Sequence, residues 1–389
     1  MAVKEIKKSN WVSSFTLTGA AKISNYTYKI DEQKEGSDWV YSSMNLGVDC
    51  GEKHGVVYAD MMGGFSASGN SKIYVHGKNE DGTDNFDNRF EVDWDDRNNP
   101  EILDTIGRMS FLTVGIEETS NKKTFYKNFL SAYDAINYCK DFLKDGMVIT
   151  VKGNIKYSTY NGNVTVNKNI TSIALSKAED SSKYKATFTQ TVLLDKDSAP
   201  FTKDNIDKDK GVIYVNARVL DYVKEINGVE IKGNYPFAKT FEYALPSDAE
   251  KAKKAVNVLF GAKKNITQIT MNGNFIEGGA VKQITLDDIP DDIKALINIG
   301  VFSEEEALEK CAVNGNREQR MVFTTPYIKN VKNGDDVTPV LQKFDDAFKE
   351  KDLDFSEFFN KADNNALDEY EEILGDEESD DFDWLSKLD

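Results

Sequence analysis

The most constraining feature of this 389-residue chain is an order of predicted elements that occurs twice. Each copy has a strand (122–130 and 238–246), a helix of about four turns, and a β-hairpin. Within the hairpins, ITVKGNI at 149–155 aligns with ITMNGNF at 269–275, and the second copy ends in the strand-like stretch 281–286. Short matches of this kind carry weight when the elements before them also match. We interpret the agreement as a duplication.

β-rich segments precede both helices. In the stretch VIYVNARVLDYV, Val215, Ala217 and Val219 alternate with side chains of the opposite face, as in a strand with one buried side. Three strands, a helix and two more strands are the element order of the OB-fold, a five-stranded Greek-key barrel. The sequence therefore predicts a mainly β protein with some α+β elements, built from two tandem OB-fold barrels.

These patterns divide the chain into four parts. We expect the first barrel domain at 1–178, with an insertion around 62–105 that contains two strand-like stretches. The second barrel domain is expected at 179–289, followed by an extension of helix and strand at 290–334. Residues 335–389 are expected to form an acidic tail with two amphipathic helical stretches and a disordered end.

Charge is distributed unevenly along the chain. The net charge is −18, but residues 335–389 hold 20 acidic and 5 basic side chains, so residues 1–334 carry only −3. A sequence pI of 4.7 would ordinarily argue against a nucleic-acid partner. Because the acidity is concentrated in the tail, a local basic strip on the nearly neutral body stays compatible with one.

The sequence lacks the usual signatures of catalysis and metal binding. It has two histidines, no Walker loop, no glycine pattern for a dinucleotide and no HExxH motif. Cys50, His54, His76 and Cys139 have a spacing that fits no standard zinc pattern. We therefore expect a protein that is not an enzyme and that uses no cofactor and no metal.

The N-terminus and the cysteines indicate the cellular compartment of the protein. Three widely spaced cysteines, Cys50, Cys139 and Cys311, favour free thiols in a reducing compartment. The first residues contain no apolar signal core, and no run reaches the roughly 18 apolar residues of a membrane span. We expect a soluble, cytoplasmic protein.

Binding to single-stranded nucleic acid fits the remaining side chains. It needs aromatic faces on which bases stack and cations that follow the phosphates. If the apolar side of each strand fills its barrel, the other side presents such groups. In the first barrel these are Lys122, Lys123, Tyr126, Lys152, Lys156, Tyr157 and Tyr160. In the second barrel they are Tyr214, Arg218, Tyr222, Lys224, Lys232, Tyr235, Phe237 and Lys239.

The chain ends in an acidic run with an aromatic and apolar tip, DEESDDFDWLSKLD. A barrel body with such a tail resembles the single-stranded DNA-binding proteins of bacteria and their viruses. The resemblance implies sequence-nonspecific protection of single-stranded DNA during replication, recombination and repair, with partner proteins engaging the tail. The residues that match best are Asp380, Asp381, Phe382, Asp383, Trp384 and Leu385.

The chain departs from the bacterial type, and other functions stay open. Two barrels in one longer chain, and an end in LSKLD, point to a bacteriophage-encoded protein acting in the host cytoplasm. One alternative is an acidic mimic of DNA that blocks a host enzyme. Another is a β-rich structural component of a virion. The sequence leaves open DNA or RNA preference and oligomeric state.

Overall fold

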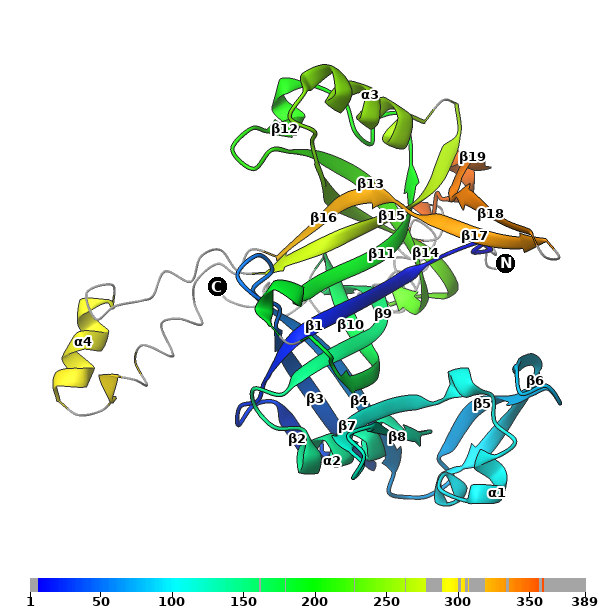
Figure 1. Cartoon of the computed structure of the whole chain (residues 1–389), viewed down its shortest axis with the longest axis vertical. Helices are drawn as coiled ribbons and strands as arrows, with labels where there is room; N and C mark the ends of the chain where they lie inside the picture. The colour runs from blue at the N-terminus through cyan, green and yellow to red at the C-terminus, as the bar shows by residue number, and fades with distance from the viewer. Residues whose placement is uncertain are drawn as a thin grey trace, which may run out of the picture.

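In the computed structural model, two β-barrels share one continuous sheet (Figure 1). None of the helices in its described residues is long and apolar enough to cross a membrane. The structure describes residues 6–160, 162–178, 180–226, 228–262, 264–277, 289–299, 302–304, 307, 319–333, 336–356 and 359.

The first barrel closes by pairing each strand with the next in the order β1, β3, β4, β10, β9 and back to β1. Helix α2 (Ala132–Phe142) lies between the third and fourth strands in sequence, and the Ser131 side chain caps it by accepting a bond from the Tyr133 amide. This is the OB-fold order. The strands are β1 (Ser13–Lys22), β3 (Trp39–Asp49), β4 (Val56–Ser66), β9 (Val148–Tyr160) and β10 (Asn163–Leu175).

The second barrel repeats this order with β11, β13, β14, β16 and β15, which pairs back to β11. Its helix α3 (Ala249–Phe260) buries Phe260 against Tyr243 and Phe323 of the barrel core. Helix α4 (Asp291–Asn298) falls between β15 and β16. The strands are β11 (Lys185–Leu194), β13 (Val212–Ile226), β14 (Val229–Ala244), β15 (Ile266–Glu277) and β16 (Gln319–Pro326).

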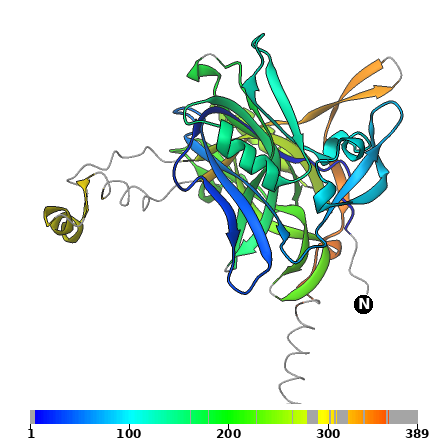
Figure 2. The ribbon, with the colours of Figure 1, turned by 90° about the horizontal axis from the view of Figure 1, so that it is seen from below.

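Further elements decorate both barrels, and in Figure 2 the orange ribbon of β17 and β18 projects from the body. In the insertion, the two predicted strand-like stretches pair with each other as β5 and β6. The remaining elements are β2 (Tyr28–Gln33), β5 (Lys72–Lys78), β6 (Asp84–Asp93), α1 (Pro100–Leu103), β7 (Leu112–Glu118), β8 (Thr124–Phe129), β12 (Ile206–Asp207), β17 (Ile328–Asn333), β18 (Asp336–Leu341) and β19 (Lys343–Phe348).

The first strands of the two barrels, β1 and β11, pair with each other in antiparallel register. Phe15 lies opposite Phe188 across this pair. On its other side Phe15 faces Gly153 of β9, and Phe188 faces Gly273 of β15. These glycines are the matching positions of the two aligned hairpin sequences, so the duplication is present in the fold. The two barrels are thus related by approximate two-fold symmetry about the Phe15–Phe188 pair.

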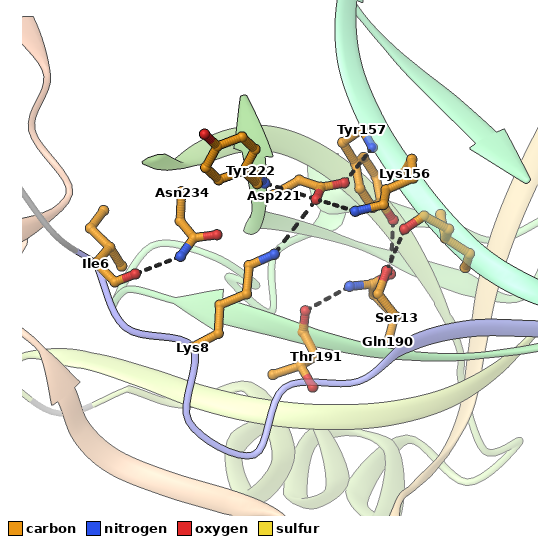
Figure 3. Close-up of polar contacts among 11 residues, drawn as sticks. Ile6, Lys8, Ser13, Lys156, Tyr157, Gln190, Thr191, Asp221, Tyr222 and Asn234 are labelled. Atoms are coloured by element: carbon orange, nitrogen blue, oxygen red, sulfur yellow. Dashed lines mark hydrogen bonds and ion pairs between the residues drawn. The ribbon is translucent and has the colours of Figure 1, made fainter. Parts of the chain in front are cut away.

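Each barrel also reaches over to hold the end of the other barrel's fourth strand. From the loop after β3, the His54 carbonyl accepts from the Glu277 amide at 2.9 Å. From β13, the buried Asp221 carboxylate accepts from the Tyr157 amide at 2.9 Å and pairs with Lys156 at 3.1 Å (Figure 3). The two contacts are symmetry counterparts. They fix one barrel against the other.

Two further contacts seal this junction. Lys168 of β10 forms a buried ion pair with Glu277 at 2.7 Å, and its ammonium lies 5.1 Å from the centre of the Phe275 ring. The N-terminal segment crosses the same region, because Asn234 donates to the Ile6 carbonyl and Lys8 lies 3.6 Å from Asp221 (Figure 3). The junction is therefore a packed interface rather than a linker.

The observed strands correct the sequence-based assignment in three places. The third strand of the first barrel is β4, whereas residues 122–130 contain β8, an edge strand paired with β7. The strand that closes the second barrel is β16, and the stretch 281–286 lies outside the described residues. The first of the two predicted amphipathic helical stretches, residues 340–351, instead contains the end of β18 and all of β19.

We predict that Gly153→Ala lowers the free energy of unfolding by about 1–3 kcal/mol or more, since overpacking a core usually costs this much. A Cβ there would lie 1.9 Å from the Asn169 carbonyl oxygen and 2.7 Å from the Phe15 ring. Urea denaturation measures the effect, with Asn154→Ala on the exposed side of the same strand as the control. Equal stability of the two variants would contradict this packing.

Candidate nucleic-acid interface

The outer surface of β3 and β4 carries aromatic and apolar side chains, although the inner surface alone fills the barrel. Met44, Leu46 and Val48 point inward and are buried. The alternate positions of β3 and β4 present the first face, which we define as Trp39, Tyr41, Tyr58 and Met62. Trp39 is 44% exposed and Met62 is 68% exposed. In OB-folds the second and third strands carry the ligand.

A row of three amide side chains and one carboxylate crosses the first face. Asn45, Asp60, Asn169 and Asn154 lie opposite one another on β3, β4, β10 and β9. The Asn45 amide donates to Asp60 at 2.5 Å. Amides both donate and accept, so this row suits the edges of bases. The single carboxylate disfavours a phosphate at this point.

Cations stand on both sides of this row. Lys29 of β2 lies opposite Ser43, and Lys152 of β9 lies opposite Ser172. Both side chains are exposed. Asp60 repels phosphates at the centre of the first face, whereas Lys29 and Lys152 can bind phosphates at its two edges.

Four of the predicted first-barrel residues besides Lys152 are exposed in positions that suit a ligand. Tyr126 lies on the same outer surface as Lys152, because β8, β7, β10 and β9 are paired in that order, and it is 55% exposed. Lys122 and Lys123 occupy the exposed turn between β7 and β8. Tyr160 is 71% exposed at the end of β9, beside the hairpin turn.

Two other predicted residues of the first barrel, one buried and one exposed, make contacts with the second barrel. Tyr157 is only 3% exposed, donates its hydroxyl to Gln190, and so cannot stack on a base. Lys156 is engaged by Asp221 in the junction between the barrels. Both belong to the contact that holds the barrels together, because the β13–β14 hairpin extends far enough to cover this end of β9.

In the second barrel, Tyr214, Arg218 and Tyr222 share the outward side of β13, as predicted; we call them the second face. Tyr222 is 55% exposed, and Lys224 beyond it is also exposed. The Tyr214 hydroxyl donates to Asp207 at 3.2 Å, and burial followed by this bond raises the pKa of Tyr214. Arg218 lies 3.5 Å from Asp195.

The remaining predicted residues of the second barrel are buried, half-buried or paired with another side chain. Phe237 is 1% exposed and belongs to the core. Lys239 is half-buried, and desolvation, followed by repulsion from Lys168, lowers its pKa. Lys232 is exposed and pairs with Glu230. Tyr235 packs against Phe237 and against aromatic rings of the chain's C-terminal part.

That C-terminal part covers one side of the second face. The Arg218 guanidinium also pairs with Glu350, and Leu353 and Phe355 are buried. Phe355 lies 5.2 Å from Tyr235 between ring centres. A hollow of 550 Å³ remains at this contact, lined by Arg218, Tyr235, Pro236, Glu350, Lys351, Leu353, Asp354, Phe355, Ser356 and Phe359.

The side chains considered for zinc do not converge. Cys50 and Cys139 are buried, and desolvation raises the pKa of each thiol to about 12. His54 lies in the junction and His76 in the insertion, where its Nε2 is 2.7 Å from Asp84. Among the described residues no three His, Cys, Asp or Glu side chains are grouped as metal ligands.

The first face is the part of the site that sequence reasoning missed. Its signal was present, because Trp39, Tyr41 and Ser43 alternate with residues that fill the barrel. Residues 122–130 were predicted to be the third strand of the first barrel, so the outward side chains of β4 were not considered. A stricter test of period-two alternation along 56–62 would have placed Tyr58 and Met62 outside.

Two closed barrels with the same strand order, each with a helix between its third and fourth strands, define a tandem OB-fold protein. The family model described as YorF matches residues 75–277, which is more than half of the chain. The chain therefore belongs to the YorF family.

Solved structures and curated proteins add little beyond this family. The wild-type single-stranded DNA-binding protein from Thermus aquaticus matches with 9% identity and a TM-score of 0.31, over 84% of this chain and 98% of that chain. A deletion mutant of the same protein matches with 12% identity and a TM-score of 0.28, over 69% and 88%. A search of curated proteins found no match.

The buried His54 predicts a pH dependence of stability. Its Nδ1 lies 2.9 Å from the Phe275 carbonyl, and burial lowers its pKa despite this contact. The unfolded chain binds a proton below about pH 6.5, whereas folded His54 stays neutral until a lower pH. Unfolding free energy should therefore fall as the pH drops below about 6.5, by up to roughly 1.4 kcal/mol per pH unit.

Urea denaturation of the wild type and of His54→Gln between pH 7.5 and 5 tests this. The variant should lose the part of the pH slope that His54 contributes, while the carboxylates common to both proteins cancel in the comparison. Parallel curves for the two proteins would contradict the burial of a neutral imidazole.

Proposed function

We propose that this protein binds single-stranded DNA without sequence preference. The observation that carries the proposal is the first face: Trp39, Tyr41, Tyr58 and Met62 lie outward on the two strands that OB-folds use for oligonucleotides. A partly exposed Trp and a largely exposed Met beside two Tyr are unusual on a surface without a ligand. Lys29 and Lys152 flank them.

Stacking and phosphate contacts supply the affinity in this proposal. Each base that stacks on an aromatic side chain contributes roughly 1–3 kcal/mol and does so for any base. The exposed lysines replace counterions along the backbone, so binding weakens as salt rises. The second face offers Tyr222 for the same purpose, while Arg218 is occupied by Asp195 and Glu350.

The cellular role that we propose is protection of single-stranded DNA in replication, recombination and repair. Partner proteins would bind the end of the chain, where Asp380, Asp381, Asp383, Phe382, Trp384 and Leu385 combine charge with an apolar anchor. These residues lie outside the described ones.

A fluorescence titration with poly-dT tests DNA binding. Trp39 is more than one-third exposed, so its stacking on bases should quench the intrinsic fluorescence. Trp39→Ala should weaken binding by roughly 1–3 kcal/mol and remove much of the quenching. The apparent affinity of the wild type should fall linearly on a log–log plot against salt.

Val258→Ala is the matched control, because this apolar side chain is 65% exposed on α3, which contributes no residue to either face. It should bind poly-dT like the wild type. No response of the wild type to poly-dT at low salt would reject DNA binding and favour the acidic mimic of DNA.

We further propose that the acidic C-terminal part competes with DNA for the second face. Its described portion already places Glu350 against Arg218 and buries Phe355 beside Tyr235. Deleting residues 363–389, or replacing Glu350 with Gln, should raise affinity for poly-dT at low salt and have less effect at high salt. Deletion should also abolish partner binding. Unchanged affinity of both variants at low salt would reject the competition.

A further inference from the structure

The insertion between β4 and β7 presents an aromatic surface made of residues that belong to neither barrel face. In Figure 1 its hairpin β5–β6 lies at the lower right. Tyr74 is 78% exposed and Phe86 is 52% exposed. They line a hollow of 440 Å³ together with Val75, His76, Arg89, Phe90 and Glu91. Volumes of this order are typical of small-ligand sites.

The floor of this hollow is held in a fixed orientation. The His76 ring stacks on Phe86, with 4.6 Å between ring centres. Its Nε2 lies 2.7 Å from Asp84 and its Nδ1 lies 2.9 Å from the Ser110 hydroxyl, so the imidazole cannot turn without losing both contacts. Arg89 donates through Nε to the Phe86 carbonyl at 3.0 Å. Phe86 is therefore positioned in advance of any ligand.

The charged side chains that line the hollow are Arg89 and Glu91, and the lining His76 is held by Asp84. In the hairpin register Arg89 lies opposite His76, and Glu91 lies opposite Tyr74. Lys72 at the start of the hairpin pairs with Asp93. The exposed Arg89 can contact an anion attached to a flat group that stacks on Tyr74 or Phe86.

The insertion leaves the barrel at the end of β4 that lies beside Trp39. Trp39 lies opposite Ser66, the last residue of β4, and β5 begins six residues later at Lys72. Two contacts hold the hairpin to this end of the barrel: Trp94 stacks on Phe65 at 4.9 Å between centres, and Arg97 binds Asp134 of α2 at 2.7 Å. The insertion is therefore anchored near the end of the first face at which Trp39 lies.

We propose that the hollow between Tyr74 and Phe86 takes one unpaired nucleobase of the same DNA strand, with Arg89 contacting its phosphate. This inference rests on the proposed function. Two exposed rings and an exposed guanidinium match the base and the phosphate of a nucleotide within a chain. Stacking of this kind is open to any base, so the site would extend the footprint of the protein on DNA rather than select a sequence.

The test compares the full-length wild type with the double variant Tyr74→Ala/Phe86→Ala. Fluorescence anisotropy measures binding to a labelled dT oligomer of about 35 nucleotides, long enough for two OB-folds and the insertion. The double variant should bind roughly tenfold more weakly or worse. Met109→Ala, a 72% exposed residue of the insertion that does not line the hollow, should bind like the wild type.

The outcomes separate the two proposals. If the wild type does not bind dT, the proposed function fails and this inference fails with it. If the wild type binds and the double variant binds equally well, only the nucleobase site is overturned, and the aromatic hollow would have to serve a protein partner.

A second measurement uses the wild type and so does not depend on folding of a variant. A dT oligomer that carries 5-iododeoxyuridine is crosslinked to the protein by light, and the modified peptides are mapped. Crosslinks at Tyr74 or Phe86 are expected in addition to those on the first face. Crosslinks on the first face without any in residues 72–91 would overturn the site.

Discussion

Pairing of β1 with β11 is the constraint on which the rest of the structure depends. Each first strand has a partner from its own barrel on one side and the other barrel's first strand on the other. Phe15 and Phe188 are 2% exposed at the centre of this arrangement, and burial of each contributes about 1.5–3 kcal/mol. The glycines beside them are required because a Cβ would collide with the phenyl rings.

This pairing determines where ligands can bind. Because the barrels join through their first strands and through the ends of their fourth strands, the second and third strands stay largely on the outside. The junction also uses groups that would otherwise be candidates for binding DNA. Asp221 engages Lys8 and Lys156, and Glu277 engages Lys168. The cations left near a ligand stand at the edges of the faces.

The sequence predicted the fold best where the signal is local. The aligned hairpin sequences placed Gly153 and Gly273 correctly, and the element order gave two barrels of the observed type. It failed where contacts are distant in sequence. The closing strand β16 follows β15 only after residue 318. The spacing of Phe344 and Phe348 suits a helix, yet both residues pair with β15, because tertiary pairing overrides a local pattern.

For the site, alternation predicted the two sides of each strand but not what covers each side. Tyr214, Arg218 and Tyr222 do share one face. Tyr157 and Phe237 were predicted to be exposed, but both are buried. A strand that runs beyond its own barrel can be covered by the other barrel, and the sequence does not show this. The cover of the second face by Leu353 and Phe355 was equally invisible.

Amide hydrogen exchange with and without a dT oligomer tests the central claim most directly, since it reports every strand of one protein in one experiment. The account predicts that residues 13–18 and 185–190, the paired first strands, exchange slowest in the free protein and do not change on binding. Exchange should slow on binding in residues 39–66. Rapid exchange across the β1–β11 pair, or no change in residues 39–66 when DNA is bound, would contradict it.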